Sequence, residues 1–358
     1  MFYFDRTKTI KSRHSSGLTR VSHRLLEELQ PLLGEKLAEV WWDGRRRQFR
    51  LVKGRESVEP GPGDTLLTPE LFDETLRPGF GEFLERTEAS TAALFHDAIP
   101  LRHPEFTWPQ SVARHPFYMK MLALFDKVLT VSASSGVDLA EYWDWLRLGK
   151  VPSLHTLRLG ANFRGDKRIY PAALKPWSER HQILCVGILE PRKNQSTALE
   201  ALSFLWKQSF EGGVAIVGRV NPHFGEPIRK TIKALTKKGF PITYHGQVGD
   251  EELQALYRES RFTLFPSVAE GCGLPVLESL WSGVPVVANP IPSVRESATE
   301  GGCHFLDCNH PDILGEGLLQ IWDDQALWER LDGEIAKRDL PTWGQTAQEA
   351  LRILEESG

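Results

Sequence analysis

The sequence has few cysteines and no long apolar run. Its 358 residues include four cysteines, and Cys185 lies in an apolar, strand-like run. Four cysteines are too few for a disulfide framework in a chain of this length, so we expect reduced thiols. No apolar stretch approaches the roughly 20 residues that span a bilayer, and the N-terminus opens on charged residues instead of a secretion signal. These absences predict a cytoplasmic protein.

Metal-binding patterns are also missing. Cys303-His304 and Cys308-x-His310 are the nearest approach to a ligand cluster. Their spacing fits none of the usual zinc patterns, and the segment lies beside a predicted strand. We therefore expect no metal site here.

Length and composition predict two domains. A chain of 358 residues with 41% hydrophobic content can form more than one core. The stretch 165–177, with its prolines and charges, is the natural linker and hinge. We predict one domain over residues 1–172, a second over 173–342, and an amphipathic helix within 343–358.

Each half alternates strands and helices, which is typical of parallel sheets and of the α/β class. The first half has strand patterns at 1–5, 37–42, 48–52, 91–95 and 127–132, and helix patterns at 18–33, 118–125 and 135–142. The second half has strand patterns starting near 181 and at 214–217, 242–244 and 262–265, and a capped helix opening at Asp250.

The N-terminal segment is basic. Against one acid, Asp5, residues 1–24 contain Arg6, Lys8, Lys11, Arg13, Arg20 and Arg24. Such a segment indicates a phosphate-bearing acceptor or a membrane surface, and a solvated face is the alternative.

The most informative segment is 265–296, FPSVAEGCGLPVLESLWSGVPVVANPIPSVRE. It predicts a turn from Glu270 to Gly273 after a buried strand. A helix follows, with Pro275 as its first residue and Glu278 in its first turn. The alternative is an ordinary strand, turn and helix in which Glu278 only complements the helix dipole.

That turn fits a nucleotide sugar. The helix dipole and closely approaching backbone N–H groups stabilise an anion, so a diphosphate would lie against Gly271, Cys272, Gly273 and Leu274. Carboxylates would repel that phosphate if they touched it. We therefore assign Glu270 and Glu278 to the hydroxyls of a sugar and a ribose on either side.

A second candidate is the loop GILEPRKN that begins at Gly187. It places Arg192 and Lys193 between a strand and a helix. Arg binds phosphate as a fork and Lys as a point charge, so the loop suits a diphosphate. An exposed basic loop is the alternative.

Two residues of the first half are further candidates. His96 closes an apolar strand, where an imidazole can meet a ligand or be a satisfied structural histidine. The neighbouring Asp97 is expected to cap or orient the loop. Gly17, in HSSGLTRV, would let the backbone face a diphosphate or form a plain tight turn.

Together these segments resemble glycosyltransferase family 4, whose E-x7-E signature matches Glu270 and Glu278, followed by GVPVVANPIPSVRE. The resemblance covers most of the chain and is strongest over 181–296. It implies retaining enzymes of the GT-B fold, with two facing Rossmann-like domains and a final helix that crosses back to the first domain.

The resemblance also implies roles for these residues. Lys193 aligns with the family's phosphate-neutralising lysine. Many members carry an arginine where this chain has Ile188, so we expect Arg192 to take its place. His96 would contact the donor sugar and belong to the catalytic group with Glu270, Lys193 and Arg192. The nucleotide base would lie beside Gln247 and Val248.

The mechanism expected from the resemblance needs no metal and no cofactor. The sequence has no Asp-x-Asp motif, the usual metal clamp of the other large glycosyltransferase fold. Cationic side chains and helix dipoles can stabilise a leaving diphosphate. Attack from the front face, with the leaving phosphate accepting the acceptor's proton, would retain the anomeric configuration.

We therefore expect a glycosyltransferase that moves a hexose, best mannose from GDP-mannose, to a growing cell-surface or lipid-linked glycan. The loop form GILEPRKN resembles members that act on mannose. Alternatives are a UDP-sugar donor, a non-catalytic scaffold, or an epimerase or phosphorylase. We also expect peripheral association with the inner membrane. We do not expect a nucleic-acid partner.

Overall fold

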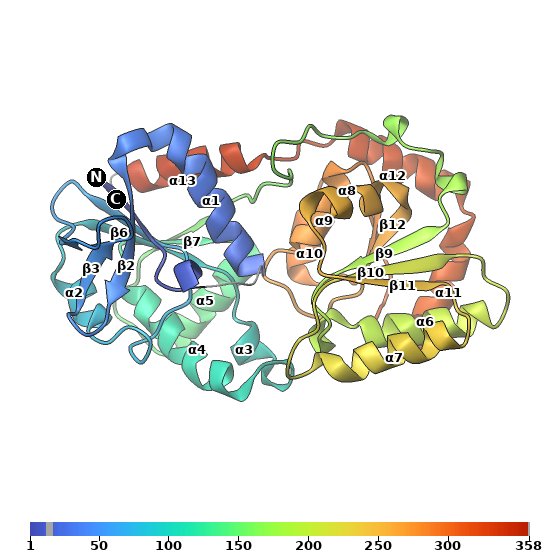
Figure 1. Cartoon of the computed structure of the whole chain (residues 1–358), viewed down its shortest axis with the longest axis horizontal. Coiled ribbons are helices and arrows are strands. Elements are labelled where there is room, and N and C mark those ends of the chain that lie inside the picture. The colour runs from blue at the N-terminus through green and yellow to red at the C-terminus, as the bar shows by residue number, and fades with distance from the viewer. Residues whose placement is uncertain (12–16, 357–358) are drawn as a thin grey trace. The chain divides into compact units, whose positions relative to one another are not determined.

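The computed structural model describes residues 1–11 and 17–356, and Figure 1 shows its helices and strands. The chain forms two compact units, Met1–Gly160 with Pro341–Gly358, and Ala161–Leu340. Each unit has its own sheet and its own core.

The predicted linker is part of the second unit. The Arg168 guanidinium donates to the carbonyls of Ile335 and Arg338, both at 2.5 Å, and the Ile169 N–H donates to the carbonyl of Trp281 at 3.0 Å. A boundary at 172 therefore falls inside this unit. The segment continues through the short 3₁₀ turns η5 (Pro171–Ala173) and η6 (Trp177–Glu179).

The first unit contains an eight-stranded sheet in the order β4-β3-β2-β1-β5-β6-β7-β8. Its strands are β1 (Phe2–Asp5), β2 (Leu37–Asp43), β3 (Gln48–Leu51), β4 (Ser57–Val58), β5 (Thr65–Thr68), β6 (Ser90–Phe95), β7 (Lys127–Thr130) and β8 (Ser153–Thr156). From β2 through β1 to β8 the neighbours are parallel, whereas β2-β3-β4 is an antiparallel edge. The expected parallel sheet and the pairing of the second and third strands are confirmed.

Helices cover both faces of this sheet (Figure 1). They are α1 (Gly17–Leu33), α2 (Phe80–Arg86), α3 (Ile99–Arg102), α4 (Pro109–Met121), α5 (Ala133–Trp145) and α13 (Trp343–Glu355), with 3₁₀ turns η1 (Thr9–Lys11), η2 (Gly34–Lys36), η3 (Pro104–Phe106) and η4 (Leu122–Leu124). The helix expected at 118–125 is wrong in its bounds. The helix starts at Pro109, because the missing N–H of a proline would be unpaired at that position in any case. The first turns of α4 are polar, so the apolar spacing that predicts a helix is not visible there.

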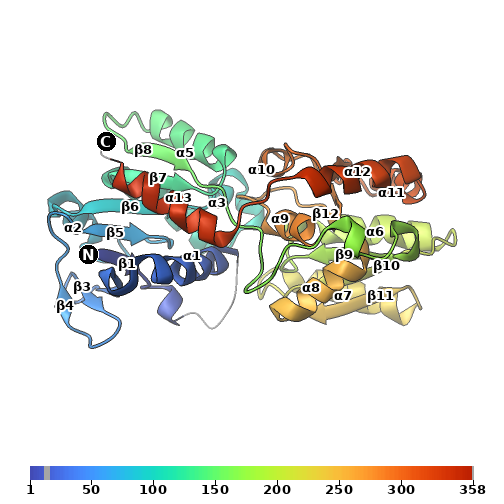
Figure 2. The same ribbon diagram turned by 90° about the horizontal axis from the view of Figure 1, so that it is seen from above.

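The C-terminal helix α13 belongs to the first unit, as expected. Figure 2 shows it beside α1, against which it packs. A capping box between Thr342 and Gln345 starts the helix. At its other end the buried Lys127 ammonium donates to the carbonyl of Ile353 at 2.7 Å. This cation is well placed to complement the negative end of the helix dipole.

The second unit contains a fully parallel six-stranded sheet in the order β11-β10-β9-β12-β13-β14. Its strands are β9 (Gln182–Val186), β10 (Gly213–Val217), β11 (Ile242–Gly246), β12 (Ser260–Phe265), β13 (Val286–Ala288) and β14 (Cys303–Phe305). The strand order reverses between β9 and β12. In open α/β sheets, ligands bind outside the carboxyl ends of the strands at such a switch point.

The helices of this unit are α6 (Gln195–Trp206), α7 (Gly225–Lys237), α8 (Asp250–Glu259), α9 (Leu274–Trp281), α10 (Pro292–Ser297), α11 (Pro311–Trp322) and α12 (Gln325–Lys337), with the 3₁₀ turn η7 (Pro191–Lys193). Helix α8 begins at Asp250, but its N-cap is Gly249 and no side chain caps it. Its first-turn acids still complement the helix dipole.

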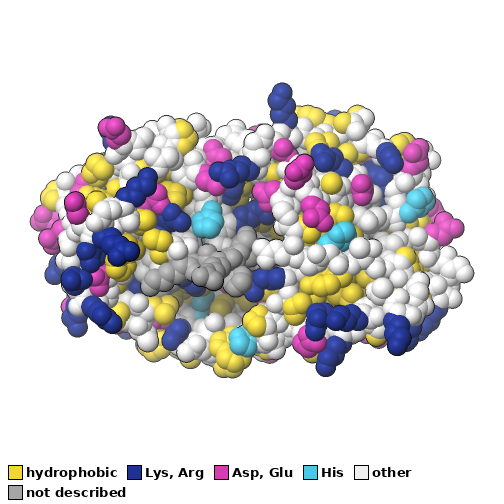
Figure 3. All heavy atoms as spheres, viewed as in Figure 1, with side chains coloured by type: hydrophobic (Ala, Val, Ile, Leu, Met, Phe, Trp, Pro, Cys, Tyr) yellow, Lys and Arg dark blue, Asp and Glu magenta, His cyan; other side chains and the backbone are white. Residues whose placement is uncertain are grey.

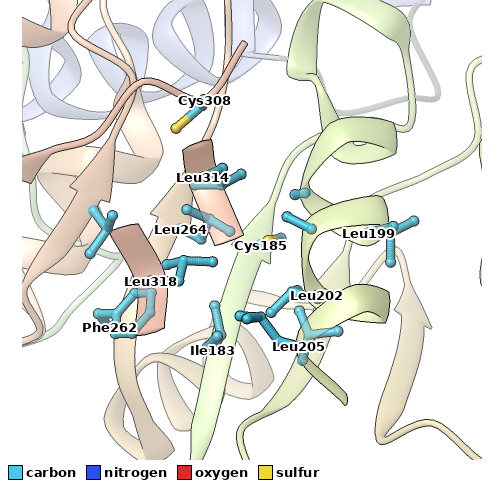
Figure 4. Packing of buried hydrophobic residues seen from close by; sticks show 14 of the residues in the cluster. Ile183, Cys185, Leu199, Leu202, Leu205, Phe262, Leu264, Cys308, Leu314 and Leu318 are labelled. Carbon is cyan, nitrogen blue, oxygen red and sulfur yellow. The ribbon is translucent and has the colours of Figure 1, made fainter. Parts of the chain in front are cut away.

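The core of the second unit lies between the sheet and helices α6 and α11. Figure 4 shows Ile183 of β9 and Phe262 and Leu264 of β12 packed with Leu202 of α6 and Leu318 of α11, all fully buried. At about 25 cal/mol per Å² of apolar surface, each such side chain contributes about 2 kcal/mol. This packing holds the carboxyl ends of β9 and β12 in place.

The four cysteines form no disulfide, as expected. Cys185 is buried in the core shown in Figure 4, and burial raises the pKa of its thiol to about 12. Cys303 and His304 lie on β14.

None of the described helices is long and apolar enough to cross a bilayer. On the face drawn in Figure 3, basic and acidic side chains are interspersed.

Candidate functional site

Two loops meet at the carboxyl ends of β9 and β12. The loop after β9 runs from Gly187 to Asn194, and the loop after β12 runs from Pro266 to Gly273. The N–H of Val268 donates to the carbonyl of Arg192 at 2.9 Å. This bond joins the loops predicted for the diphosphate and for the sugar at the switch point.

Glu270 pairs with both predicted cations. Nζ of Lys193 donates to Oε1 of Glu270, and Nη1 of Arg192 donates to Oε2 of the same carboxylate at 2.8 Å. Nη1 of Arg192 also donates to the carbonyl of Ala269 at 3.0 Å. The structure therefore brings together three of the residues predicted to be catalytic.

The ion pairs are screened little by solvent. The side chains of Lys193 and Glu270 are 9% and 8% exposed. Burial alone would raise the pKa of Glu270, but Arg192 and Lys193 lower that pKa to about 2. Burial lowers the pKa of Lys193, against the raising effect of Glu270. Glu270 is therefore ionised at neutral pH.

A further acid, Glu190, completes this cluster and was not predicted. Its Oε1 lies 2.6 Å from Nε of Arg192, and its Oε2 accepts a hydrogen bond from Asn221 at 2.9 Å. The guanidinium of Arg192 thus lies between two carboxylates. The sequence GILEPRKN contains this acid, but its spacing alone does not show that Glu190 forms an ion pair with Arg192.

Gly187 makes room for Lys193. A Cβ at position 187 would lie 3.2 Å from both Cδ and Cε of Lys193, which is closer than ordinary contact. The ammonium then passes 5.2 Å from the centroid of the Phe265 ring, a cation–π distance. A Cβ at Gly187 would therefore force the Lys193 stem to shift by a few tenths of an ångström.

The turn from Glu270 to Gly273 leads into α9, but one residue earlier than predicted. Gly273 is the N-cap in the left-handed conformation, with φ +82°, so Leu274 is the first helical residue and Pro275 the second. Glu278 consequently lies in the second turn, and its expected place in the first turn is wrong. Its buried carboxylate accepts a hydrogen bond from the Tyr257 hydroxyl at 3.3 Å.

Two serines of α10 hold the main chain of the turn. Oγ of Ser293 donates to the carbonyl of Glu270 at 2.8 Å, and Oγ of Ser297 donates to that of Cys272 at 3.0 Å. Burial and the nearby Glu296 raise the pKa of the Cys272 thiol to about 12. The carbonyls of Glu270 and Cys272 are therefore satisfied within the protein.

Gln247 and Val248 follow β11 at the same edge of the sheet. Gln247 is exposed and Val248 half-buried. Strand β10 separates β11 from β9. The contact of Gln247 and Val248 with the nucleotide base remains a prediction.

In the first unit, His96 is buried, and its Nε2 and its carbonyl have partners. Its Nε2 lies 2.9 Å from the carbonyl of Pro69, and its carbonyl accepts from Oγ of Ser135 at 3.0 Å. Burial lowers the pKa of His96, so the ring is neutral. The Ile99 N–H donates to Oδ1 of Asp97 at 3.0 Å, the loop-orienting contact expected of that residue. A ligand-binding role for His96 remains a prediction.

Gly17 is the first residue of α1, and Arg13 lies outside the described residues.

The backbone of the basic N-terminal segment binds to Glu70, an acid that the sequence analysis did not single out. Glu70 accepts hydrogen bonds from the N–H groups of Lys8 and Thr9, at 2.5 and 2.6 Å, and it lies 3.1 Å from Nη2 of the buried Arg77.

The second unit matches a protein family. The model of glycosyl transferases group 1 aligns with residues 166–338. Among curated proteins, the serotype-specific mannosyltransferase WbdA of Escherichia coli is 29% identical over 304 residues, covering 81% of this chain and 36% of its own length. The chain thus spans about a third of the first curated relatives that it matches.

Two further relatives are shorter. The O-antigen chain mannosyltransferase B of Escherichia coli is 31% identical over 165 residues, covering 44% of this chain and 43% of that protein. The phosphatidyl-myo-inositol mannosyltransferase of Mycobacterium leprae is 24% identical over 272 residues and covers 69% of each protein.

Solved structures show the same fold along almost the whole chain. Sucrose-phosphate synthase from Thermosynechococcus elongatus superposes with a TM-score of 0.71 at 16% identity, covering 98% of this chain and 97% of that one. Anabaena HepE superposes with a TM-score of 0.69 at 12% identity, covering 99% and 98%. The chain therefore adopts the GT-B fold, and its residues 166–338 match the family model of glycosyl transferases group 1.

Proposed function

We propose that this chain is a retaining glycosyltransferase that moves mannose from GDP-mannose to a hydroxyl of a growing cell-surface or lipid-linked glycan, without a metal ion. The observation that carries the proposal is the buried cluster of Glu270, Lys193 and Arg192 at the switch point of the second sheet. It combines an acceptor for sugar hydroxyls with cations for a leaving diphosphate.

The ion pairs suggest how the donor binds. A diphosphate is an anion that competes with Glu270 for the hydrogen-bond donors of Lys193 and Arg192. As the cations turn towards phosphate, the carboxylate becomes available to accept hydrogen bonds from the sugar. Because Glu270 has a pKa of about 2, it remains an acceptor at neutral pH.

In the proposed reaction, the bond from the anomeric carbon to the phosphate oxygen breaks as the acceptor oxygen attacks the same face. The acceptor's proton passes to the departing phosphate oxygen, so a glycoside and GDP are formed. Lys193 and Arg192 stabilise the charge that develops on the diphosphate. Glu270 positions the sugar and takes no covalent part, and His96 remains the proposed contact of the first unit.

The donor assignment draws on the relatives. Proteins named as mannosyltransferases align with much of the chain, and the loop GILEPRKN resembles family members that act on mannose. A UDP-sugar donor is the alternative. A non-catalytic scaffold is favoured by one specific observation, the apolar Ile188 at the position where many members have arginine. The cytoplasmic location and the peripheral membrane contact expected from the sequence remain part of the proposal.

The first experiment is a calorimetric and thermal-shift panel of GDP, UDP, ADP and their common sugar conjugates with the purified protein in EDTA. A ligand that binds only the folded state raises the melting temperature. Stabilisation by GDP and GDP-mannose alone would support the proposal, and stabilisation by UDP conjugates would replace the donor. If no nucleotide binds, the scaffold interpretation takes its place.

A donor that binds is then tested for turnover. GDP release from GDP-mannose is measured with lipid-linked and soluble glycan acceptors, and the anomeric configuration of the product is read by NMR. Loss of turnover in EDTA, or inversion of configuration, would contradict the corresponding part of the proposal.

A further inference from the structure

Arg219 lies directly across from Ile188, in the segments that follow β10 and β9. The pairing of β9 with β10 matches Val186 with Val217, and beyond the strands Leu189 forms a parallel bridge with Val220. The same register matches Ile188 with Arg219. Paired residues of neighbouring parallel strands lie at the same height and send their side chains to the same face of the sheet.

Hydrogen bonds fix this register after the strands end. The N–H of Gly187 donates to the carbonyl of Val217, and the N–H of Leu189 donates to the carbonyl of Arg219, both at 2.9 Å. The two chain segments therefore continue side by side into the loops. A long side chain at Arg219 starts from the position that neighbours the apolar Ile188.

The four charges of the cluster balance one another. Glu190 and Glu270 together carry as much negative charge as Arg192 and Lys193 carry positive charge, and all four are joined by ion pairs. A diphosphate would add negative charge to a set that is already neutral. Another positive group nearby would offset that added charge.

Arg219 is such a group. It is half-buried, which limits the screening of its charge by solvent. Among the residues that the structure describes, it has no hydrogen bond or ion pair through its side chain, unlike Arg192 and Lys193. Its guanidinium is therefore available to bind phosphate as a fork.

We propose that Arg219 binds the diphosphate of the nucleotide-sugar donor and supplies, from the segment that follows β10, the cation that position 188 lacks in the segment that follows β9. The proposal rests on the proposed function and names a further donor-binding residue for it. The ligand class is a nucleoside diphosphate, and the role is electrostatic stabilisation of the bound and departing phosphates.

The test compares ligands that differ only in phosphate. GDP, GMP and guanosine are titrated by calorimetry in EDTA into the wild type and into Arg219→Met, which keeps the aliphatic stem and removes the charge. The UDP series is used if the wild type prefers it. We expect Arg219→Met to weaken diphosphate binding by about tenfold or more, the loss typical of one charge-assisted hydrogen bond, and to leave nucleoside binding within about twofold.

Two further variants control the comparison. Arg229→Met removes another arginine of the same unit, one that pairs with Glu226 on the exposed surface of α7, and it should change neither affinity. Arg219→Lys keeps the charge but loses the fork, so its loss of diphosphate affinity should be smaller. If Arg219→Met does not fold, Arg219→Lys carries the same comparison of diphosphate with nucleoside.

The outcomes separate this inference from the proposed function. Wild-type binding of GDP or UDP with unchanged diphosphate affinity in the Arg219 variants would overturn the inference alone. An equal loss for diphosphate and nucleoside would also overturn it, because Arg219 would then act on the base or on the fold. If the wild type binds no nucleoside diphosphate, the proposed function fails and this inference fails with it.

Discussion

The ammonium of Lys193 donates a hydrogen bond to the carboxylate of Glu270 across 77 residues of sequence, and both side chains are nearly buried. Water screens neither charge well, so Lys193 is stabilised chiefly by Glu270, whereas Glu270 is stabilised by both Lys193 and Arg192. Removing one partner of such a buried pair leaves the other uncompensated, which is costly. This dependence gives substitutions at the pair two separate readouts, activity and stability.

The first prediction concerns Glu270→Gln. The substitution preserves shape but removes the charge that accepts hydrogen bonds from the sugar and from both cations. We expect turnover to fall by orders of magnitude and the free energy of unfolding at pH 7 to fall by about 3 kcal/mol, while circular dichroism remains native. Steady-state kinetics and urea titration measure the two effects.

A matched control is Glu226→Gln, which removes an exposed carboxylate that pairs with Arg229. Exposed pairs contribute little to stability, so neither activity nor stability should change much. Near-normal turnover of Glu270→Gln would remove Glu270 from the site.

The second prediction is a pH dependence of stability. The pKa of Glu270 is lowered from its ordinary 4.5 to about 2 in the folded protein, so its stabilising effect is complete above pH 4.5 and is lost as the pH falls towards 2. The full effect corresponds to about 3 kcal/mol. Urea titrations of the wild type and Glu270→Gln should therefore differ most near neutral pH and converge only as the pH falls to about 2. A difference that stays constant from pH 7 to pH 3 would contradict the lowered pKa.

The sequence predicted the frame of the site better than its contacts. Apolar runs of strand length and the glycines after them are local signals, so the strand before Glu270 and the loop before Lys193 were found. The pairing of Lys193 with Glu270 could not be predicted from the sequence, because it depends on two strands that are distant in sequence lying side by side. Both residues were instead assigned separately to the ligand.

Errors at element boundaries had local causes. The sequence places Glu278 in the first turn because proline is often the first helical residue, whereas Gly273 in its left-handed conformation lets the helix begin at Leu274.

The contacts of Glu70 are not predicted from the sequence, because its partners Lys8 and Thr9 lie 62 and 61 residues away. A buried acid that binds backbone N–H groups leaves no periodic pattern.

The third prediction concerns Lys193→Ala. Loss of the ammonium should weaken the binding of GDP and UDP and lower turnover together, by about tenfold or more in affinity, because one charge-assisted contact to the diphosphate is lost. Calorimetry measures the affinity, and Lys237→Ala at the exposed end of α7 is the control. An unchanged affinity for both nucleotides would refute the assignment of Lys193 to the diphosphate.

The fourth prediction tests whether Gly187 acts through Lys193. A Cβ at this position would lie 3.2 Å from two carbons of the Lys193 side chain, and the φ of +156° is one that alanine rarely adopts. Gly187→Ala should therefore shift the Lys193 side chain and weaken nucleotide binding. If the effect runs through Lys193, the double variant Gly187→Ala/Lys193→Ala should bind no more weakly than Lys193→Ala alone, and a double-mutant cycle measures this coupling. Gly149→Ala, where an added Cβ meets no atom within 4 Å, should bind normally. Additive losses in the double variant would show instead that Gly187 acts on the ligand or the loop independently of the lysine.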